Sequence, residues 1–109
     1  MAYDDNLAQL LRDDIIGLPD ISEKHMFGGL CFLLQGNMLC GVHKFAAMYR
    51  VGPAHYDQAL AVPGVRPLSF TGRPMRGLVD ADETVMTDPA HRQALLTLAL
   101  DFVGQLPAK

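Results

Sequence analysis

Two strand-like apolar runs on either side of Gly36-Asn37 constrain the fold of this chain more than any other feature. The runs cover residues 30–35 and 38–43. A glycine-asparagine pair between two such runs is typical of a tight two-residue turn. The sequence therefore predicts a β-hairpin in which Gly36 and Asn37 are the turn residues, and hence a fold built on an antiparallel sheet.

Two further strands flank this hairpin in the sequence. The first covers residues 22–27 and is separated from the hairpin by Gly28-Gly29, which predicts a tight corner between strands. The second covers residues 45–51. Its alternation places one pair of side chains on each face of the sheet, Met48 and Arg50 on one and Tyr49 and Val51 on the other.

Apolar residues at intervals of three and four predict a helix at the start of the chain. Asp4 or Asp5 can cap its amino end, and Gly17 followed by Pro19 ends it. Asp13-Asp14 lies at the negative end of this helix, so we expect Arg12 or another cation to compensate it.

The second half of the chain predicts two more helices and one or two strands. A short helix begins at Gly52-Pro53, and a longer one begins at Thr87-Asp88-Pro89, where a capping side chain precedes proline. Between them we expect an edge strand around residues 68–70 and a strand from Leu78 that ends in an acidic turn at residues 80–83. The predicted fold class is α+β, a two-layer domain with an antiparallel sheet of about five strands and helices at the N-terminus, middle and C-terminus.

The composition is that of one soluble globular domain. The chain has 109 residues, enough for one core and too few for two, so residues 1–109 are expected to form a single domain. The net charge is −3, so the domain as a whole does not have the positive charge with which nucleic-acid-binding domains neutralise phosphates. The start is acidic and no apolar run approaches the ~20 residues of a membrane helix, so we expect a cytoplasmic protein with no membrane partner.

The hairpin register bears on the two cysteines. With Gly36-Asn37 as the turn, Cys31 and Cys40 are diagonal neighbours on one face, roughly 7 to 8 Å apart and too distant for a disulfide. We expect buried free thiols. The spacing Cys40-x-x-His43 places those two side chains on opposite faces, and the other histidines share no ligand spacing. The sequence therefore predicts no metal site, no cofactor and no catalytic residue.

A group of cations remains unexplained. Arg66, Arg73 and Arg76 lie within eleven residues of a proline- and glycine-rich segment in a chain that is acidic overall. The planar fork of arginine suits a carboxylate or a phosphate. Alternatively, Arg50 and Arg73 pair internally with the acidic residues at 80–83 and serve the fold alone.

Several short motifs carry a family resemblance. They are Lys24-x-Met26-Phe27-Gly28-Gly29, Gly36-Asn37-Met38, Arg50-Val51 and Phe70-Thr71-Gly72-Arg73-Pro74-Met75. Together they resemble the TfoX amino-terminal domain family, named for bacterial regulators of natural competence. The resemblance implies a fold related to secretion chaperones and a non-enzymatic regulatory role in transcriptional control of competence genes. It also implies a stand-alone form that lacks the second, helical domain of many members.

The expected binding site combines these motifs with the cations. We predict that Arg73 and Met75 lie beside the Phe27-Gly28-Gly29 corner and Arg50, as a shallow site with a cationic rim and an apolar floor. The candidate binding residues are Lys24, Phe27, Gly28, Gly29, Arg50, Arg73, Pro74, Met75 and Arg76. Three ligands stay open: a protein partner, a small anion held by a binding protein or enzyme, and weakly bound nucleic acid.

The hairpin strands carry apolar residues on both faces. The predicted register places Cys31, Leu33 and Cys40 on one side and Phe32, Leu34 and Leu39 on the other. A sheet with helices on one face only should leave its other face polar. We therefore expect a homodimer or a sheet that is covered on both faces.

Overall fold

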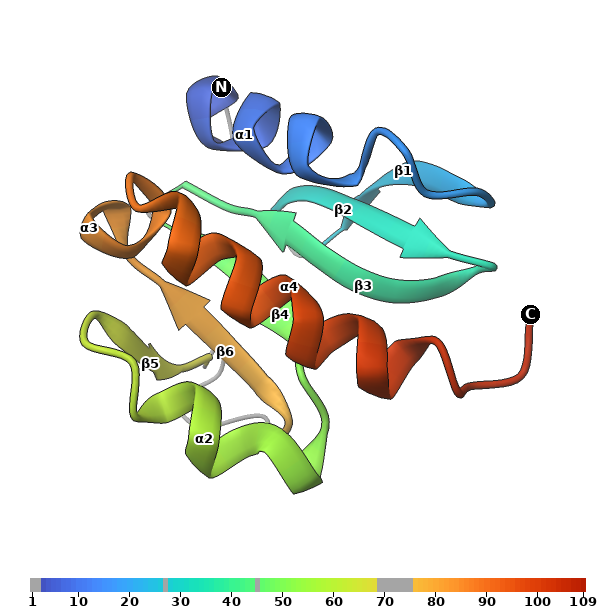
Figure 1. Cartoon of the computed structure of the whole chain (residues 1–109). Helices are drawn as coiled ribbons and strands as arrows, with labels where there is room; N and C mark the ends of the chain where they lie inside the picture. The colour runs from blue at the N-terminus through green and yellow to red at the C-terminus, as the bar shows by residue number, and fades with distance from the viewer. Residues whose placement is uncertain (1–2, 27, 45, 69–75) are drawn as a thin grey trace.

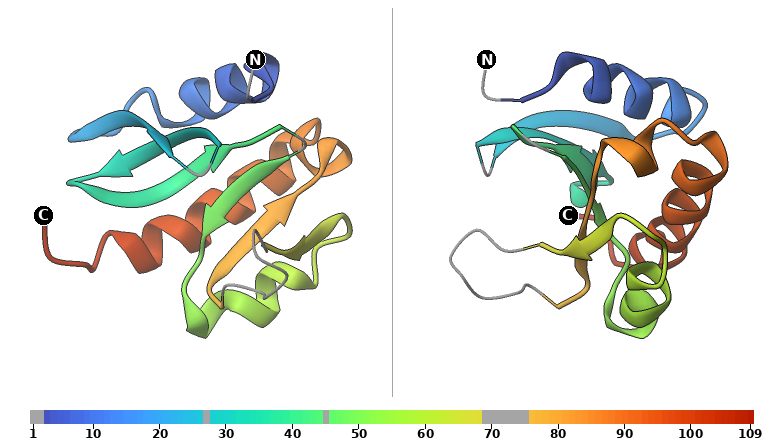
Figure 2. Two further views of the ribbon diagram at one scale, coloured as in Figure 1. Left: turned by 180° about the vertical axis from the view of Figure 1, so that it is seen from behind. Right: turned by 90° about the vertical axis from the view of Figure 1, so that its left-hand side faces the viewer.

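The computed structural model describes residues 3–26, 28–44, 46–68 and 76–109 as a six-stranded antiparallel sheet with helices on one face (Figure 1). The strand order is β1-β2-β3-β4-β6-β5. The helices all lie on the same side of the sheet, which is clearest in the right-hand view of Figure 2. In chain order the elements are α1 (Asp5–Ile15), β1 (Ile21–Met26), β2 (Gly29–Leu34), β3 (Asn37–Val42), β4 (Ala47–Arg50), the 3₁₀ helix η1 (Pro53–His55), α2 (Tyr56–Leu60), β5 (Val65–Pro67), β6 (Leu78–Ala81), α3 (Glu83–Met86) and α4 (Pro89–Val103).

The predicted α+β class is confirmed, with six strands where about five were expected. The edge strand β5 ends at Pro67, whereas the sequence placed it around residues 68–70. Its pairing explains the shift, because Val65 and Pro67 lie opposite Ala81 and Val79 of β6. Residues 69–70 lie outside the described residues.

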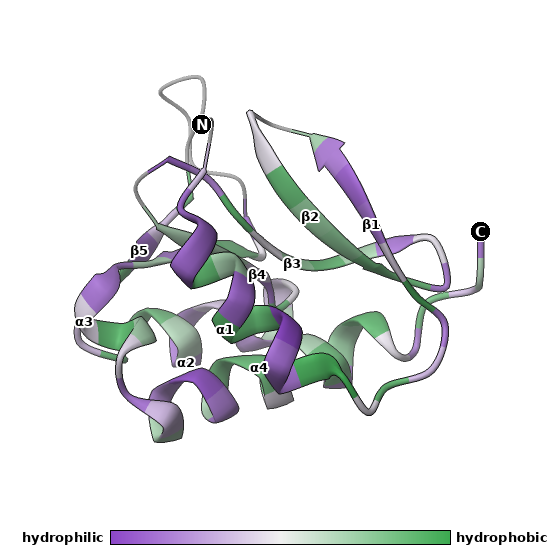
Figure 3. Ribbon diagram, turned by 90° about the horizontal axis from the view of Figure 1, so that it is seen from above, coloured by the Kyte–Doolittle hydropathy of each residue, from purple (hydrophilic) through white to green (hydrophobic). Residues whose placement is uncertain are grey.

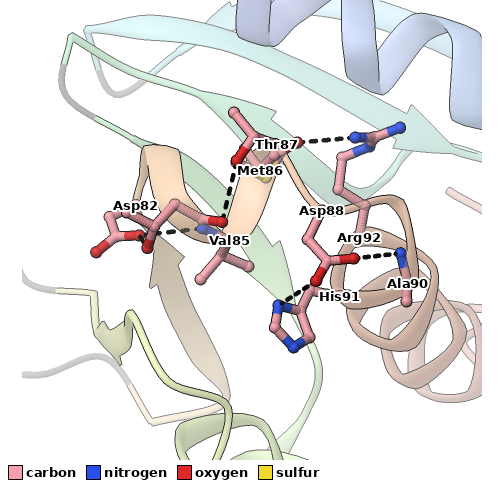
Figure 4. Close-up of polar contacts among 9 residues, drawn as sticks. Asp82, Val85, Met86, Thr87, Asp88, Ala90, His91 and Arg92 are labelled. Atoms are coloured by element: carbon pink, nitrogen blue, oxygen red, sulfur yellow. Dashed lines mark hydrogen bonds and ion pairs between the residues drawn. The ribbon is translucent and has the colours of Figure 1, made fainter.

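The helix starts follow the capping side chains that the sequence predicted. The carboxylate of Asp4 accepts hydrogen bonds from the backbone N–H groups of Asn6 and Leu7, and that of Asp88 accepts from Ala90 directly after Pro89. The helix α3 was not predicted, and only its first residue, Glu83, belongs to the acidic turn that the sequence predicts at residues 80–83. Asp82 caps it by accepting from the backbone N–H of Val85 (Figure 4). The hydrogen bond from Thr84 is the largest cause of the lowered pKa of Asp82.

The cation that compensates the acidic end of α1 comes from the other end of the chain. Arg92 of α4 donates from Nε to Asp14 Oδ2 at 2.9 Å, and both side chains are largely buried. Its Nη1 also donates to the backbone oxygen of Met86 (Figure 4). Arg12 is instead paired with Glu23 on β1, at 2.9 Å and in solvent. The pair of Asp14 and Arg92 therefore joins α1 to α4 above the sheet.

The hairpin register differs from the prediction by one residue. The turn residues are Gln35 and Gly36, with φ of 51° and 85°, and Asn37 is the first residue of β3. Two successive positive φ values are what a tight hairpin turn of this hand requires. Asn37 is buried, and its Nδ2 donates to the backbone oxygen of Pro107 at 2.9 Å. This contact with the C-terminal segment favours the observed register.

The cysteines are free and buried, as predicted, but the predicted reason is wrong. The register shifts between Leu33, opposite Met38, and Phe32, opposite Cys40, so that β3 carries one extra residue. Cys40 joins the core beneath the helices, while Cys31 joins a second cluster on the other face. The two thiols are therefore on opposite faces of the sheet.

The two faces of the sheet bury different sets of side chains. The face beneath the helices carries Phe32, Leu39 and Tyr49, all essentially inaccessible to solvent. We call the opposite side the helix-free face. It carries a smaller cluster, of which the fully described members are Cys31, Met38, Met48 and Leu68, with Met26, Leu33 and Leu78 partly buried against them. Because Phe32 and Leu39 are covered by helices of the same chain, they do not call for a second copy of the protein, and the homodimer stays a prediction.

Candidate functional site

The helix-free face is organised in rows that run across the strands. Lys24 of β1 lies opposite Cys31 of β2, Cys31 opposite Gly41 of β3, and Gly41 opposite Met48 of β4. Gly41 has no side chain, and a Cβ there would come within 3.0 Å of the terminal methyl of Met48. Glycine therefore lets the Met48 side chain lean over β3 toward Cys31.

A hollow opens on this face between β1 and β4, and we call it the methionine hollow. Its volume is about 430 Å³. Its apolar lining comes from Met26, Leu33, Met38 and Leu78, and its cations are Lys24, Arg50 and Lys109, with Gly36 completing the lining. Thioether side chains adapt to ligands of irregular shape, so this floor suits an apolar side chain beneath a cationic rim.

A second hollow of about 390 Å³ adjoins the first, and we call it the arginine hollow. It is lined by Arg50, Gly52, Pro53, Arg76, Gly77, Leu78 and Phe102. Arg50 and Leu78 line both hollows. We therefore treat the methionine hollow and the arginine hollow as one feature, the basic cleft, with Arg50 at its centre.

Arg50 is held by an aromatic ring from α4. Its Cζ lies 5.4 Å from the centroid of Phe102, within cation–π range. Phe102 reaches this place because residue 52 is glycine, with φ of 83°; a Cβ there would lie 2.3 Å from the ring. A contact with a ring does not use the N–H groups of the guanidinium in a salt bridge, so they can still donate to a ligand.

No described residue that lines the cleft has an acidic side chain. Arg50 and Arg76 have no ion pair with a described carboxylate, whereas Arg12 and Arg92 each have one. The alternative that Arg50 pairs with residues 80–83 is not what the structure shows, because Asp80 binds His43 at 2.7 Å and Asp82 caps α3.

The C-terminal segment supplies one cation of the rim. The backbone N–H of Lys109 donates to the oxygen of Gln35 at 2.9 Å, which brings Lys109 against the hairpin turn. Figure 1 shows the C-terminus beyond α4, on the side of the tip of β2 and β3. Two contacts, one from Lys109 and one from Asn37 to Pro107, thus attach this segment to the edge of the cleft.

The structure brings together three of the predicted binding residues, Lys24, Arg50 and Arg76, along the basic cleft. Gly28 and Gly29 lie at the corner between β1 and β2 and do not line it. Phe27, Arg73, Pro74 and Met75 lie outside the described residues, so their predicted position beside Arg50 is untested.

The glycine corner has a structural explanation. Gly28 has φ of 72°, and a Cβ on Gly29 would lie 1.9 Å from the backbone oxygen of Val42. No side chain fits at Gly29, because β3 passes too close. This agrees with the expectation of a tight corner between strands.

Sequence reasoning missed Phe102 and Lys109 as cleft residues. Phe102 lies in the last helix, and nothing local in the sequence distinguishes it from a core residue. Met26 and Met38 could have been found, because Met26 shares the parity of Lys24 on β1 and Met38 lies opposite Leu33 on the same face.

The thiols have little nucleophilic character. Burial raises the pKa of Cys31 to about 11 and raises that of Cys40 further. Over residues 3–26, 28–44, 46–68 and 76–109, no group of three or more His, Cys, Asp or Glu side chains is placed to hold a metal ion. Within those same ranges no helix is long and apolar enough to cross a membrane.

Comparison with known proteins adds the family. Residues 13–103 match the TfoX N-terminal domain, which is most of the chain and includes every strand. No curated protein and no solved structure matches the chain.

Proposed function

Since the chain belongs to the TfoX N-terminal domain family, we propose that it is a non-enzymatic interaction domain with a regulatory role, and that its basic cleft binds an acidic segment of a partner protein. The observation that carries this proposal is the position of Arg50, stacked on Phe102 between two hollows and without a carboxylate partner among the described residues. A cation held in this way is available to a ligand.

The two hollows favour a protein segment over a simple ion. The methionine hollow offers an apolar floor, and the cations Lys24, Arg50, Arg76 and Lys109 are distributed along both hollows. A segment with carboxylates on either side of an apolar residue would satisfy both features at once. The whole chain has a net charge of −3, so such a partner would be attracted by this local surface and not by the domain as a whole.

The chemistry of the lining supports binding more than catalysis. The described lining combines guanidinium and ammonium groups with thioether, aliphatic and aromatic side chains. Arginine keeps its proton at physiological pH, so it positions and attracts anions but does not exchange protons with them. We accordingly propose a regulator that acts by holding a partner, with control of competence genes as the biological setting that the family name indicates.

A small anion is the second candidate ligand, and the arginine hollow favours it. Its volume of about 390 Å³ is within the ordinary range for small-molecule sites, and it presents two guanidinium groups. Nucleic acid is a weaker candidate because the chain is acidic overall. Binding of a small anion is tested by a screen of anionic metabolites for an increase in the melting temperature of the domain. Binding of nucleic acid is tested by DNA titrations at salt concentrations from about 50 to about 300 mM, over which the affinity should fall.

Selection from a random peptide library displayed on phage tests the proposed function. We expect the immobilised domain to enrich peptides that combine acidic and apolar residues. Arg50→Ala should weaken their binding by about tenfold or more, because a charge-assisted hydrogen bond is lost. Arg12→Ala is the matched control, since Arg12 is a surface arginine outside the cleft. Enrichment of basic peptides, or equal binding by the two variants, would contradict the proposal.

A further inference from the structure

We infer that the arginine hollow is a subsite for a phosphate monoester dianion, carried by a phosphorylated serine or threonine of the segment that the basic cleft binds. This inference rests on the proposed function and adds the chemical identity of the anchoring group. It comes from how the backbone places two arginines together.

Arg50 and Arg76 lie on two chain segments that are joined directly beside them. The backbone N–H groups of Val51 and Gly52 both donate to the oxygen of Gly77, at 2.8 and 3.0 Å. Val51 follows Arg50 and Gly77 follows Arg76, so the two hydrogen bonds hold the arginines on neighbouring backbones. Both arginines are among the residues that line the same hollow.

The close approach of these segments depends on glycine. Gly77 has φ of 91°, and a Cβ there would lie 3.2 Å from the backbone of Gly52. A side chain at either position would push the segments apart or displace Phe102. The lining of the hollow therefore combines two arginines with the backbone of Gly52 and Gly77, which has no side chain.

The charge of the hollow matches a dianion. Two positive groups line it, and no described lining residue is acidic. A single carboxylate would neutralise one of them, as Glu23 does for Arg12 and Asp14 does for Arg92 elsewhere in the molecule. A phosphate monoester carries about −1.5 to −2 charges at pH 7 and three acceptor oxygens, enough for two arginine forks.

The stacking of Arg50 on Phe102 favours an oriented ligand. The contact with Phe102 restricts the Arg50 side chain, so less conformational entropy is lost when it binds an anion. Lysine at this position would keep the charge but lose both the fork and the stacking. Arg50 also lines the methionine hollow. When the phosphoryl group of the partner segment occupies the arginine hollow, the neighbouring residues of that segment would therefore lie over the apolar floor of the methionine hollow.

Titration of small anions into the intact domain, followed by NMR of its backbone amides, tests this inference. The probes are inorganic phosphate, N-acetyl-phosphoserine amide, and N-acetyl-aspartate amide as the singly charged control. We expect phosphate and the phosphoserine probe to shift the amides of Gly52, Gly77 and Phe102, and the aspartate probe to bind about tenfold more weakly or worse. Between pH 7 and pH 5 the phosphoserine affinity should fall, because its second pKa is about 6. Sulfate, which stays a dianion over this range, should bind equally at both pH values.

Variants identify the groups responsible. Arg50→Lys and Arg76→Ala should each lower phosphoserine affinity by about tenfold, since each removes one fork, and Arg12→Lys should leave it unchanged. Arg76 is exposed, so its variant should fold even if changes at Arg50 disturb the domain. Equal binding of phosphoserine and aspartate, or full binding by Arg76→Ala, would overturn the phosphate inference while leaving an acidic partner in place. Absence of binding by every acidic probe, together with selected peptides that do not depend on Arg50, would overturn the proposed function as well.

Discussion

Arg92, on the helix-covered side of the sheet, and Arg50, on the helix-free face, differ in their partners. Beneath the helices, polar side chains have partners within the fold: Asp14 with Arg92, and the Tyr49 hydroxyl with the sulfur of Met86 at 3.7 Å. On the helix-free face, Arg50 has a ring beneath it but no carboxylate among the described residues. Neighbouring residues of the same strands thus serve stability on one face and, as we propose, recognition on the other.

Residues that are adjacent in the sequence lie on opposite faces of the sheet. Met48 and Tyr49 lie on opposite faces of β4, and Met38 and Leu39 lie in different clusters on β3. Side chains along β1 are mostly polar, and those along β2 mostly apolar, as Figure 3 shows. The polar edge strand β1, with Glu23 and Lys24 exposed, also disfavours edge-to-edge pairing with other chains.

The largest expected contrast is between Leu39→Ala and Met38→Ala. Leu39 is fully buried beneath the helices, so its truncation should lower the free energy of unfolding by about 2 to 5 kcal/mol. Met38 belongs to a smaller cluster and lines a hollow, so its truncation should cost roughly half as much. Urea unfolding of both variants measures the difference. Equal losses would mean that the helix-free face is packed as firmly as the covered one.

A smaller contrast separates the paired arginine from the cleft arginine. Arg92→Met leaves the carboxylate of Asp14 in a largely buried place without its partner, which should cost about 2 to 3 kcal/mol. Arg50→Met removes a partly exposed cation–π contact and should cost less than about 1 kcal/mol.

The double variant Asp14→Leu with Arg92→Met controls for the paired charges. It should recover part of the loss, because no charge is left buried alone. A larger loss in Arg50→Met than in Arg92→Met would show that Arg50 stabilises the fold, and would weaken its proposed role in binding.

The smallest expected effect concerns the thiols. With a pKa of about 11, Cys31 is ionised to about one part in a thousand at pH 8, so native iodoacetamide labelling should be slow and should rise with pH. Cys40 should react more slowly still, because its pKa is higher and it lies beneath the helices. Mass spectrometry of the native protein at several pH values, with urea-unfolded protein as the control, measures both. Faster labelling of Cys40, or an intramolecular disulfide, would contradict the observed register.

Local chemistry accounts for the parts of the fold that the sequence predicted correctly. The caps at Asp4 and Asp88 act within three residues of each helix start, and strand parity alone separates Met48 from Tyr49. The cations Lys24, Arg50 and Arg76 could be singled out in a similar way, from residue type and, for Lys24 and Arg50, from their place on a strand. Their meeting along one cleft could not be derived, because it depends on the antiparallel pairing of β4 with β6.

Contacts between distant residues decided what the sequence left open. A two-residue turn at Gln35-Gly36 or at Gly36-Asn37 fits the local pattern, and the hydrogen bond from Asn37 to Pro107, seventy residues away, is made in the first of these registers. The same holds for Phe102, which reaches Arg50 because α4 crosses the sheet beside Gly52. The sequence by itself determined most of the helices and strands and the caps at Asp4 and Asp88, because those depend on neighbours along the chain. The tertiary structure alone decided the hairpin register, the separation of the two thiols and the assembly of the basic cleft, because each depends on backbones that pack together only after the chain has folded.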